Sequence, residues 1–422
     1  MNPCQKNWSP SAADAFLVVV AAALIAPGTS VAQTYEAPPT LRASEILPAN
    51  LVQGPDFRVK EEVVNDGVIN TYTIDSTFGQ FTAVSTAKLR QRVGEVIALG
   101  QMETVRQSDT FQKSIVESGK DTLGTIEDVV TNPVDTVSGA VSGISKAFSR
   151  AGEGLFGSNR SESEDSRFES LIGLSKTKRE YAFDFGVDVY SENEVLQQRL
   201  NELARASYAG GLVYSAALSM VPGAAGIAVS ATGMTHLTNE IYRTTAPTDL
   251  RRMNRQKLTA MGIRQDAVDH FVDNAKFSPR DQTELVLALE KMPEAKNREL
   301  FILLATLTSD RDMAFFRQRQ AQMYAGYHST VVPIDSFVGL GDFVGAHNSK
   351  GRVVFNLPLD YLVWTEWMAN AVDHVDKTIA TMSGVTGKDV VLVGTLSPYA
   401  RQQFTERGWT VSDNAEEMVA AK

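Results

Sequence analysis

Two histidines offer the side chains best suited to chemistry, because each stands among aspartates. Both lie in the repeated string Ala-Val-Asp-His, and a further aspartate follows each: Asp269, His270 and Asp273 in one copy, Asp373, His374 and Asp376 in the other. Residues three or four apart share a helix face, so His270 and Asp273 could give a nitrogen and a carboxylate to one metal ion. A zinc site needs three or four converging ligands, and these aspartates lie off the apolar helix face. The pattern therefore favours charges exposed to solvent over a metal site. If there is a metal site, the candidate ligands are His270, Asp273, Asp373 and His374.

A second set of candidates lies near the C-terminus. His347, in a predicted turn close to Asp342, could act as an acid or base because histidine titrates near neutral pH. Thr395 and Ser397 stand where a predicted buried strand ends and a helix begins, the position at which open α/β sheets bind anions. Neither pair carries a sequence fingerprint, so the catalytic residues stay unassigned.

Known catalytic signatures fail when they are compared letter by letter. Gly384–Lys388 resembles a phosphate loop, but Met382 stands where the first glycine should be, and a strand follows where a helix is needed. Ser85 and Lys88 have the serine–lysine spacing of penicillin-binding enzymes, but the chain contains no Lys-Thr-Gly. We therefore predict no cofactor and favour a protein that is not an enzyme.

The N-terminus has the three parts of a secretory signal peptide. Lys6 precedes an uncharged apolar run, Ala15–Ala26, and the small residues Ser30-Val31-Ala32 follow it. The run is shorter than the roughly 20 apolar residues that cross a bilayer. We expect cleavage between Ala32 and Gln33, and hence export.

The composition narrows the compartment and the partners. The single cysteine, Cys4, lies before the apolar run, so the mature chain has no cysteine and no disulfide. This is typical of a bacterial periplasmic or cell-envelope protein. The net charge of −10 argues against nucleic acid as a partner, because phosphate backbones are bound by positive patches.

The sequence predicts an α+β protein that is mainly helical. An N-terminal three-stranded meander with a helix precedes a central helical bundle, and a small C-terminal α/β (β-α-β) unit closes the chain. The predicted segments are 1–32 as the signal peptide, 33–56 as an extended tether, 57–156 as the meander with amphipathic helices, 157–177 as a polar linker, 178–330 as the bundle and 331–422 as the α/β unit.

Several helix boundaries are predicted from capping residues. Ser85 and the pair Ser278-Pro279 should each begin a helix, and Ser191 with Glu194 forms a capping box for a helix over 192–206. Asp360 should cap a long helix that carries Trp364, Met368, Ala371, Val375 and Ile379 on one face.

The segment 206–239 contains no charged residue and is rich in glycine and alanine: Gly210, Gly211, Pro222, Gly223 and Gly226 are among its members. Its halves on either side of Pro222-Gly223 would each reach about 22 Å as helices, which is short of a bilayer. It is therefore either a buried helical hairpin or one that dips into a membrane or joins two copies of the chain.

A basic helix follows this segment. It carries Arg251, Arg252 and Arg255, which could contact anionic lipid heads or simply form a solvated face. The predicted partners are thus a membrane surface or a second copy of the chain, and the sequence identifies no small-molecule ligand.

Three functional hypotheses follow. The preferred one is an exported, non-enzymatic scaffold that uses the glycine- and alanine-rich hairpin to contact a membrane or partner. The alternatives are a periplasmic hydrolase or ligand-binding protein with a site on the C-terminal α/β unit, and a secreted pore-former.

Overall fold

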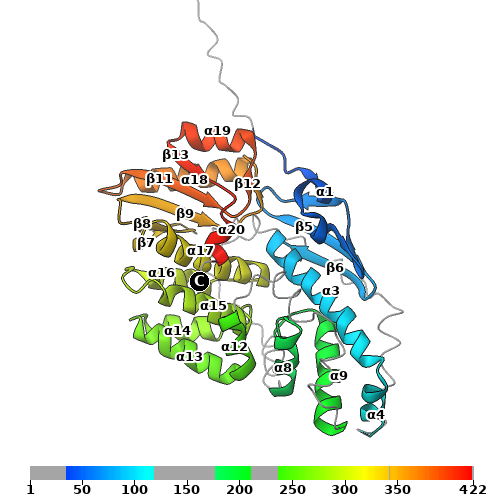
Figure 1. Cartoon of the computed structure of the whole chain (residues 1–422). Coiled ribbons are helices and arrows are strands. Elements are labelled where there is room, and N and C mark those ends of the chain that lie inside the picture. The colour runs from blue at the N-terminus through cyan, green and yellow to red at the C-terminus, as the bar shows by residue number, and fades with distance from the viewer. Residues whose placement is uncertain (1–34, 118–175, 211–235, 342, 421–422) are drawn as a thin grey trace, which may run out of the picture. The chain divides into compact units, whose positions relative to one another are not determined.

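The structure, a computed structural model, describes residues 35–117, 176–210, 236–341 and 343–420 (Figure 1). Tyr35–Lys422 forms one compact unit, and the predicted α+β class is confirmed. The predicted signal peptide, nearly all of the 157–177 linker and most of the uncharged 206–239 segment lie outside the described residues.

The N-terminal sheet is antiparallel and packs on one long helix, α3. Asn65 and Gly67, which has a φ of 109°, turn the chain between β4 and β5. Ser85 caps α3 through its side chain, which accepts from the Lys88 N–H, as the sequence predicts. The elements are β1 (Thr40–Arg42), α1 (Ala43–Ile46), α2 (Ala49–Val52), β2 (Gln53–Gly54), β3 (Phe57–Val59), β4 (Glu62–Asn65), β5 (Asn70–Ser76), β6 (Gly79–Val84) and α3 (Thr86–Arg106).

Residues 40–54 differ from the extended tether that their composition predicts. They form β1, α1, α2 and β2, and they bury Ala43, Leu47 and Leu51 against the sheet. Elements of two to four residues are too short to show a hydrophobic period, which is why the sequence pattern gives no sign of them.

A second core joins the end of α3 to helices that follow the predicted linker. Leu99 and Met102 of α3 pack with Tyr181, Phe185 and Leu200. The chain on either side of residues 157–177 therefore shares one hydrophobic core. The helices are α4 (Asp109–Glu117), α8 (Lys176–Asp184), α9 (Glu194–Gly210) and α12 (His236–Thr244).

The cap of α9 lies two residues beyond the predicted one. Asn193 Oδ1 accepts from the Leu196 N–H, so Asn193 is the capping residue. Ser191 instead donates its hydroxyl to Glu95, which is fully buried and needs hydrogen-bond donors there. The hydroxyl of Ser191, which the capping rule assigns to the start of α9, thus binds the distant buried carboxylate of Glu95 instead.

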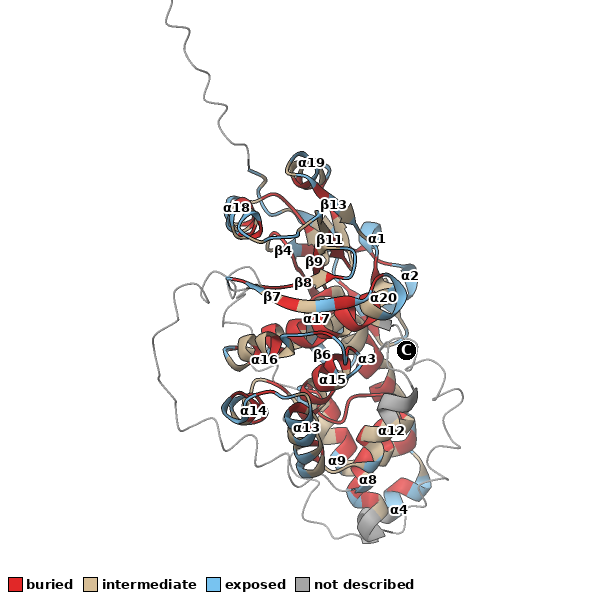
Figure 2. Cartoon of the chain, turned by 90° about the vertical axis from the view of Figure 1, so that its left-hand side faces the viewer, coloured by how far each residue is buried: buried red, intermediate tan, exposed pale blue. Residues whose placement is uncertain are grey.

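The C-terminal sheet is covered by helices on both faces. Its order is β13-β11-β9-β8-β7, with β9, β11 and β13 parallel and β7 and β8 antiparallel. Val354 and Val391 point towards α17, whereas Val353, Phe355 and Val390 point towards α18. Figure 2 shows the buried strands stacked between these two layers of helices.

The elements that build these layers run from residue 247 to residue 420. They are α13 (Pro247–Ala260), α14 (Gln265–Val272), α15 (Pro279–Glu290), α16 (Arg298–Thr306), α17 (Arg311–Thr330), β7 (Ile334–Leu340), β8 (Phe343–Asn348), β9 (Arg352–Leu357), β10 (Tyr361–Leu362), α18 (Glu366–Ala380), β11 (Gly387–Leu392), β12 (Thr395–Leu396), α19 (Pro398–Glu406), β13 (Trp409–Ser412) and α20 (Glu416–Ala420). The predicted start of α15 at Ser278-Pro279 is confirmed, with a complete capping box.

Asp360 does not cap the long helix that follows it. Thr365 caps α18 by accepting from the Met368 N–H. The Asp360 carboxylate accepts from the backbone N–H groups of Asn70 and Thr86, each at 3.0 Å, and so ties the N-terminal sheet and α3 to the chain that leads into α18. Burial raises the pKa of Asp360. The prediction was wrong because the donors lie far away in sequence.

Gly326 allows the C-terminal helix to lie directly on α17. A Cβ at this position would be 1.8 Å from the Met418 carbonyl oxygen of α20. We expect Gly326→Ala to lower the free energy of unfolding by about 1–3 kcal/mol, although alanine favours helix, because the clash displaces α20. Chemical denaturation measures this.

Gly339→Ala is the matched control, since a Cβ there meets nothing within 4 Å. It should change stability by less than about 0.5 kcal/mol. Equal stability of the two variants would contradict the close packing of α20 on α17.

Asp312 in the first turn of α17 is a source of pH-dependent stability. Burial, reinforced by Asp310 and Glu192, raises its pKa to about 6, against the opposing effect of Lys88. The folded state therefore binds the proton more tightly than the unfolded state, and stability falls as the pH rises from about 4 to about 6. Asp312→Asn should stabilise the protein by about 1–2 kcal/mol at pH 7.5 and by almost nothing at pH 4.

Denaturation of both proteins at the two pH values tests this expectation. Asp266→Asn, an exposed aspartate in the first turn of α14, is the control and should be neutral at both. If Asp312→Asn stabilises the protein equally at pH 4 and pH 7.5, burial does not raise the pKa of Asp312.

Candidate functional site: an apolar cavity beneath helix α18

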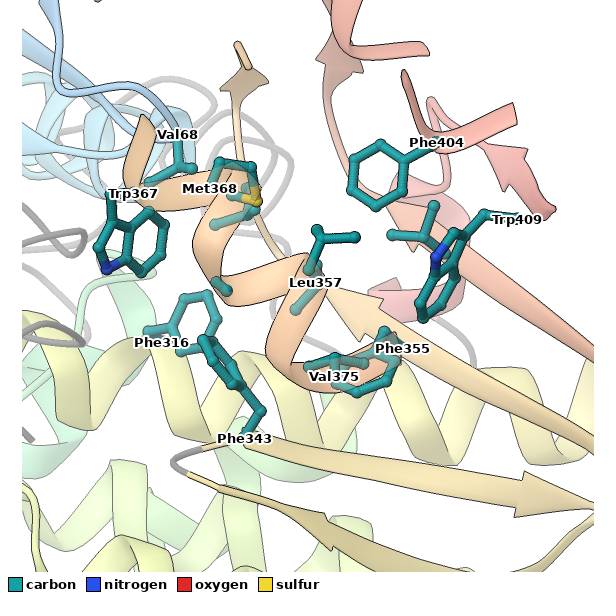
Figure 3. Close-up of a pocket in the computed structure, with 14 residues that line it drawn as sticks. Val68, Phe316, Phe343, Phe355, Leu357, Trp367, Met368, Val375, Phe404 and Trp409 are labelled. Atoms are coloured by element: carbon teal, nitrogen blue, oxygen red, sulfur yellow. The ribbon is translucent and has the colours of Figure 1, made fainter. Parts of the chain in front are cut away.

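A cavity that could hold a ligand lies between α18 and the C-terminal sheet (Figure 3). Its volume is about 60 Å³. All of its lining residues are apolar: Val68, Phe316, Phe343, Phe355, Leu357, Leu359, Trp367, Met368, Ala371, Val372, Val375, Val390, Phe404 and Trp409.

Short side chains on α18 leave this space unfilled. Ala371, Val372 and Val375 face the sheet residues Phe355 and Val390, so the helix is held off the strands without filling the gap. Aromatic rings stand at both ends, with Trp367 and Phe316 at one end and Phe404 and Trp409 at the other (Figure 3). The cavity therefore runs along the helix.

The opening of the cavity lies on the side of Trp367. Four lining residues are only partly buried: Phe343, Leu357, Trp367 and Ala371. The others, including Phe404 and Trp409, are buried. A ligand would therefore enter between the first half of α18 and the start of β8.

The second half of α18 is fixed to the sheet by charged groups. The carboxylate of Asp376 accepts from Lys388 Nζ at 2.6 Å and from Trp409 Nε1 at 3.0 Å. Asp373 lies 3.5 Å from Arg407 Nε, and Arg407 stands over the ring of Trp364. We call Asp373, Asp376, Lys388 and Arg407 the clasp, and it holds the closed end of the cavity.

The predicted anion position at the start of α19 is filled by the chain itself. Ser397 caps α19 by accepting from the Ala400 N–H, and its hydroxyl donates to Glu36 Oε2 at 2.6 Å. The same oxygen accepts from the Trp364 N–H at 2.6 Å. Burial and the nearby Glu36 charge raise the pKa of Tyr361. Thr395 lies in β12, paired with Tyr361 of β10.

The residues proposed as metal ligands take part in other contacts. Asp273 pairs with Arg251 at 2.9 Å, and Asp373 belongs to the clasp. His270 is exposed on α14, and His374 lies against Gly341 of the β7–β8 turn. The described part of the chain contains no group of three or more residues that could hold a metal ion.

The proposed acid–base residues do not converge. His347 lies in β8, opposite Ser336 and Val353 in the sheet register. No hydrogen bond joins it to Thr395 or Ser397 within the described ranges. Asp342 lies outside the described residues.

The cations of the basic helix α13 and the loop after it are paired within the protein. Each has a carboxylate within 4.0 Å: Arg251 with Asp273, Arg252 with Asp249, Arg255 with Asp269, Lys257 with Glu290 and Arg264 with Glu299. Among the helices that the structure describes, none is both long and apolar enough to cross a membrane.

Sequence reasoning found the apolar face of α18 but not the cavity or the role of Glu36. An apolar helix face indicates a core position, and only the facing side chains decide whether that core is filled. Glu36 stands in a proline-rich stretch with no period, so no local signal marks it.

No protein-family model, curated protein or solved structure matches this chain. A function for it therefore has to be argued from the cavity, the clasp and the Glu36 contacts.

Proposed function

We propose that this chain is an exported bacterial envelope protein that binds a neutral, hydrocarbon-rich small molecule in the cavity beneath α18. The observation that carries the proposal is a cavity lined entirely by apolar side chains within the core that α18 forms with the C-terminal sheet. The finer organisation expected from the sequence, with the meander, the apolar hairpin and the β-α-β unit, belongs to the same proposal.

The chemistry of the lining selects the ligand class. A polar or charged group that entered this cavity would lose its water without gaining a hydrogen bond, at a cost of roughly 2–7 kcal/mol. A hydrocarbon gains roughly 25 cal/mol for each Å² that it removes from water. Six aromatic rings and Met368 supply polarisable contact surface for it. The ligand is thus an alkyl chain or an aromatic group without charge.

Binding is favoured over hydrolysis because the cavity wall has no nucleophile or base. Ser397 hydrogen-bonds to Glu36 and to the first turn of α19. His347 lies on β8 and has no hydrogen bond to Ser397 among the described residues. Of the two activities expected for the C-terminal unit, ligand binding is the one that the geometry supports.

Export is supported by the sequence of the first 32 residues and by the lack of cysteine after them. An envelope protein meets lipids and other hydrophobic molecules at the membrane surface. A carrier or sensor for such molecules fits this location.

Titration with the neutral dye N-phenyl-1-naphthylamine tests the proposal. The purified mature chain should enhance the fluorescence of the dye saturably. Ala371→Phe should reduce the affinity at least tenfold, or by about 1.4 kcal/mol, because the new ring occupies the cavity. Its thermal stability should stay equal or rise, since filling a cavity restores packing contacts.

Ala380→Phe provides the control, because Ala380 is exposed on the same helix and does not line the cavity. It should bind the dye like the parent protein. Absence of saturable binding to the parent chain, or equal binding by the Ala371 and Ala380 variants, would remove the cavity as a binding site.

A scaffold function for the uncharged segment is the second candidate. The described helices that flank it, α9 and α12, both pack on α8. The segment therefore leaves and re-enters the protein beside one helix, which is compatible with a hairpin. We propose on this basis that it contacts a membrane or a second copy of the chain.

Fractionation of expressing cells tests the second candidate. The full chain should need detergent for release or should assemble into a larger particle, and deletion of residues 209–234 should abolish this behaviour. Soluble release of both forms as particles of equal size would exclude the scaffold. Dye release from liposomes at neutral and acidic pH would be required for the third possibility, a pore-former.

A further inference from the structure

The N-terminal segment Tyr35–Pro39 crosses from the first sheet to the helices of the C-terminal sheet, and we call it the strap. In Figure 1 it is the dark blue chain that passes close to α19 before it reaches α1. Its lower end is held by the Pro39 carbonyl, which accepts from the Asn65 N–H at 3.2 Å, and β1 begins directly after it.

Glu36 holds the upper end of the strap through three hydrogen bonds. Its N–H donates to the Trp364 carbonyl at 2.9 Å, and its Oε2 accepts from the Trp364 N–H and the Ser397 hydroxyl, both at 2.6 Å. Trp364 directly precedes Thr365, the cap of α18, and Ser397 caps α19. One side chain therefore ties together the beginnings of both helices on this face of the sheet.

Trp364, which Glu36 binds, lies next to the cavity. The ring of Trp364 is fully buried and meets the ring of Phe404 edge to face, with centroids 5.4 Å apart. Phe404 lines the cavity, and so does Met368, whose N–H is held by the Thr365 cap. A change at Glu36 reaches the cavity through one ring contact and through the first turn of α18.

The closed cavity is too small for most ligands of the proposed class. An engineered cavity of about 150 Å³ holds a single benzene ring, whereas this one measures about 60 Å³. The clasp fixes the second half of α18, so the first half, near Trp367, is the part whose movement away from the sheet would give a ligand room. This movement also acts against the hydrogen bonds of Asp360, Tyr361 and Val363 to the turn at Gly67 and Val68. That movement pulls Trp364 away from Glu36.

We propose that the strap is a latch that keeps the cavity narrow, and that ligand binding and the Glu36 hydrogen bonds exclude each other. This inference depends on the ligand site proposed above. It places the regulation of that site in the segment close to the predicted N-terminus of the mature chain. The state that binds ligand is the unlatched one, so the latch lowers the apparent affinity by the fraction of molecules that it holds closed.

Glu36→Ala is the decisive variant, because it should bind ligand more tightly than the parent chain. Loss of the acceptor favours the unlatched state, and we expect the affinity for N-phenyl-1-naphthylamine to rise about tenfold. General damage to the protein would have the opposite effect. Glu36→Gln keeps an acceptor oxygen for Trp364 and should stay within about twofold of the parent.

Glu45→Ala is the matched control, since Glu45 is an exposed carboxylate on α1 that forms an ion pair with Arg42. It should leave the affinity unchanged. Unchanged or weaker binding by Glu36→Ala, with the Ala371→Phe variant still defective, overturns the latch and leaves the binding site in place.

Hydrogen exchange separates the latch from the proposed function. Amides of residues 361–372 should exchange faster in Glu36→Ala than in the parent chain, and faster in the parent chain when the dye is bound. If the parent chain binds no dye, the proposed function fails, and the exchange comparison alone then decides the latch. Equal exchange in the two proteins overturns it.

Discussion

A sheet that contains parallel strands has to be covered on both faces, and in this chain much of one cover is a single helix, α18. On the opposite face, large side chains fill the space: Tyr324 of α17 and Phe301 of α16 meet Phe337 of β7 in edge-to-face contacts. Beneath α18 the helix contributes alanine and valine instead. At about 24 cal/mol for each Å³ of cavity, the unfilled space costs about 1.5 kcal/mol of stability. A ligand in this cavity would therefore restore packing contacts that α18 does not make.

The position of α18 depends on two carboxylates that link the N-terminal part of the chain to the residues before this helix. Asp360 accepts from backbone N–H groups of β5 and α3, and Glu36 accepts from the N–H that precedes the cap of α18. Both satisfy buried backbone donors that would otherwise be unpaired, at a cost of about 1–3 kcal/mol each. Contacts from the N-terminal part of the chain thus help to hold α18 on the C-terminal sheet.

The sequence predicts what is local. Ser85 and Ser278 cap their helices because their donors lie three residues away, and the apolar face of α18 follows from helical spacing. The wrong cap at Asp360 arises because its partner is distant: Asp360 and Asn70 are 290 residues apart. The contact between Ser397 and Glu36, which are 361 residues apart, has no local signal either. Ser191 shows the same competition, because the buried Glu95 takes its hydroxyl away from the helix start. A cavity is harder still to predict, since it depends on facing side chains from helices, strands and a turn that lie far apart in the sequence.

The opposed roles of the clasp and the strap give α18 two different ends. Lys388 and Asp376 fix the second half with a charge-assisted hydrogen bond, a class that is about twice as strong as a neutral one. The first half follows a segment that is held by the Glu36 carboxylate and by backbone hydrogen bonds to Gly67 and Val68. In the proposed latch α18 opens as a hinge about the clasp, with the space appearing at the Trp367 end, where the lining residues are only partly buried. The size of that opening would then set which hydrocarbons can enter.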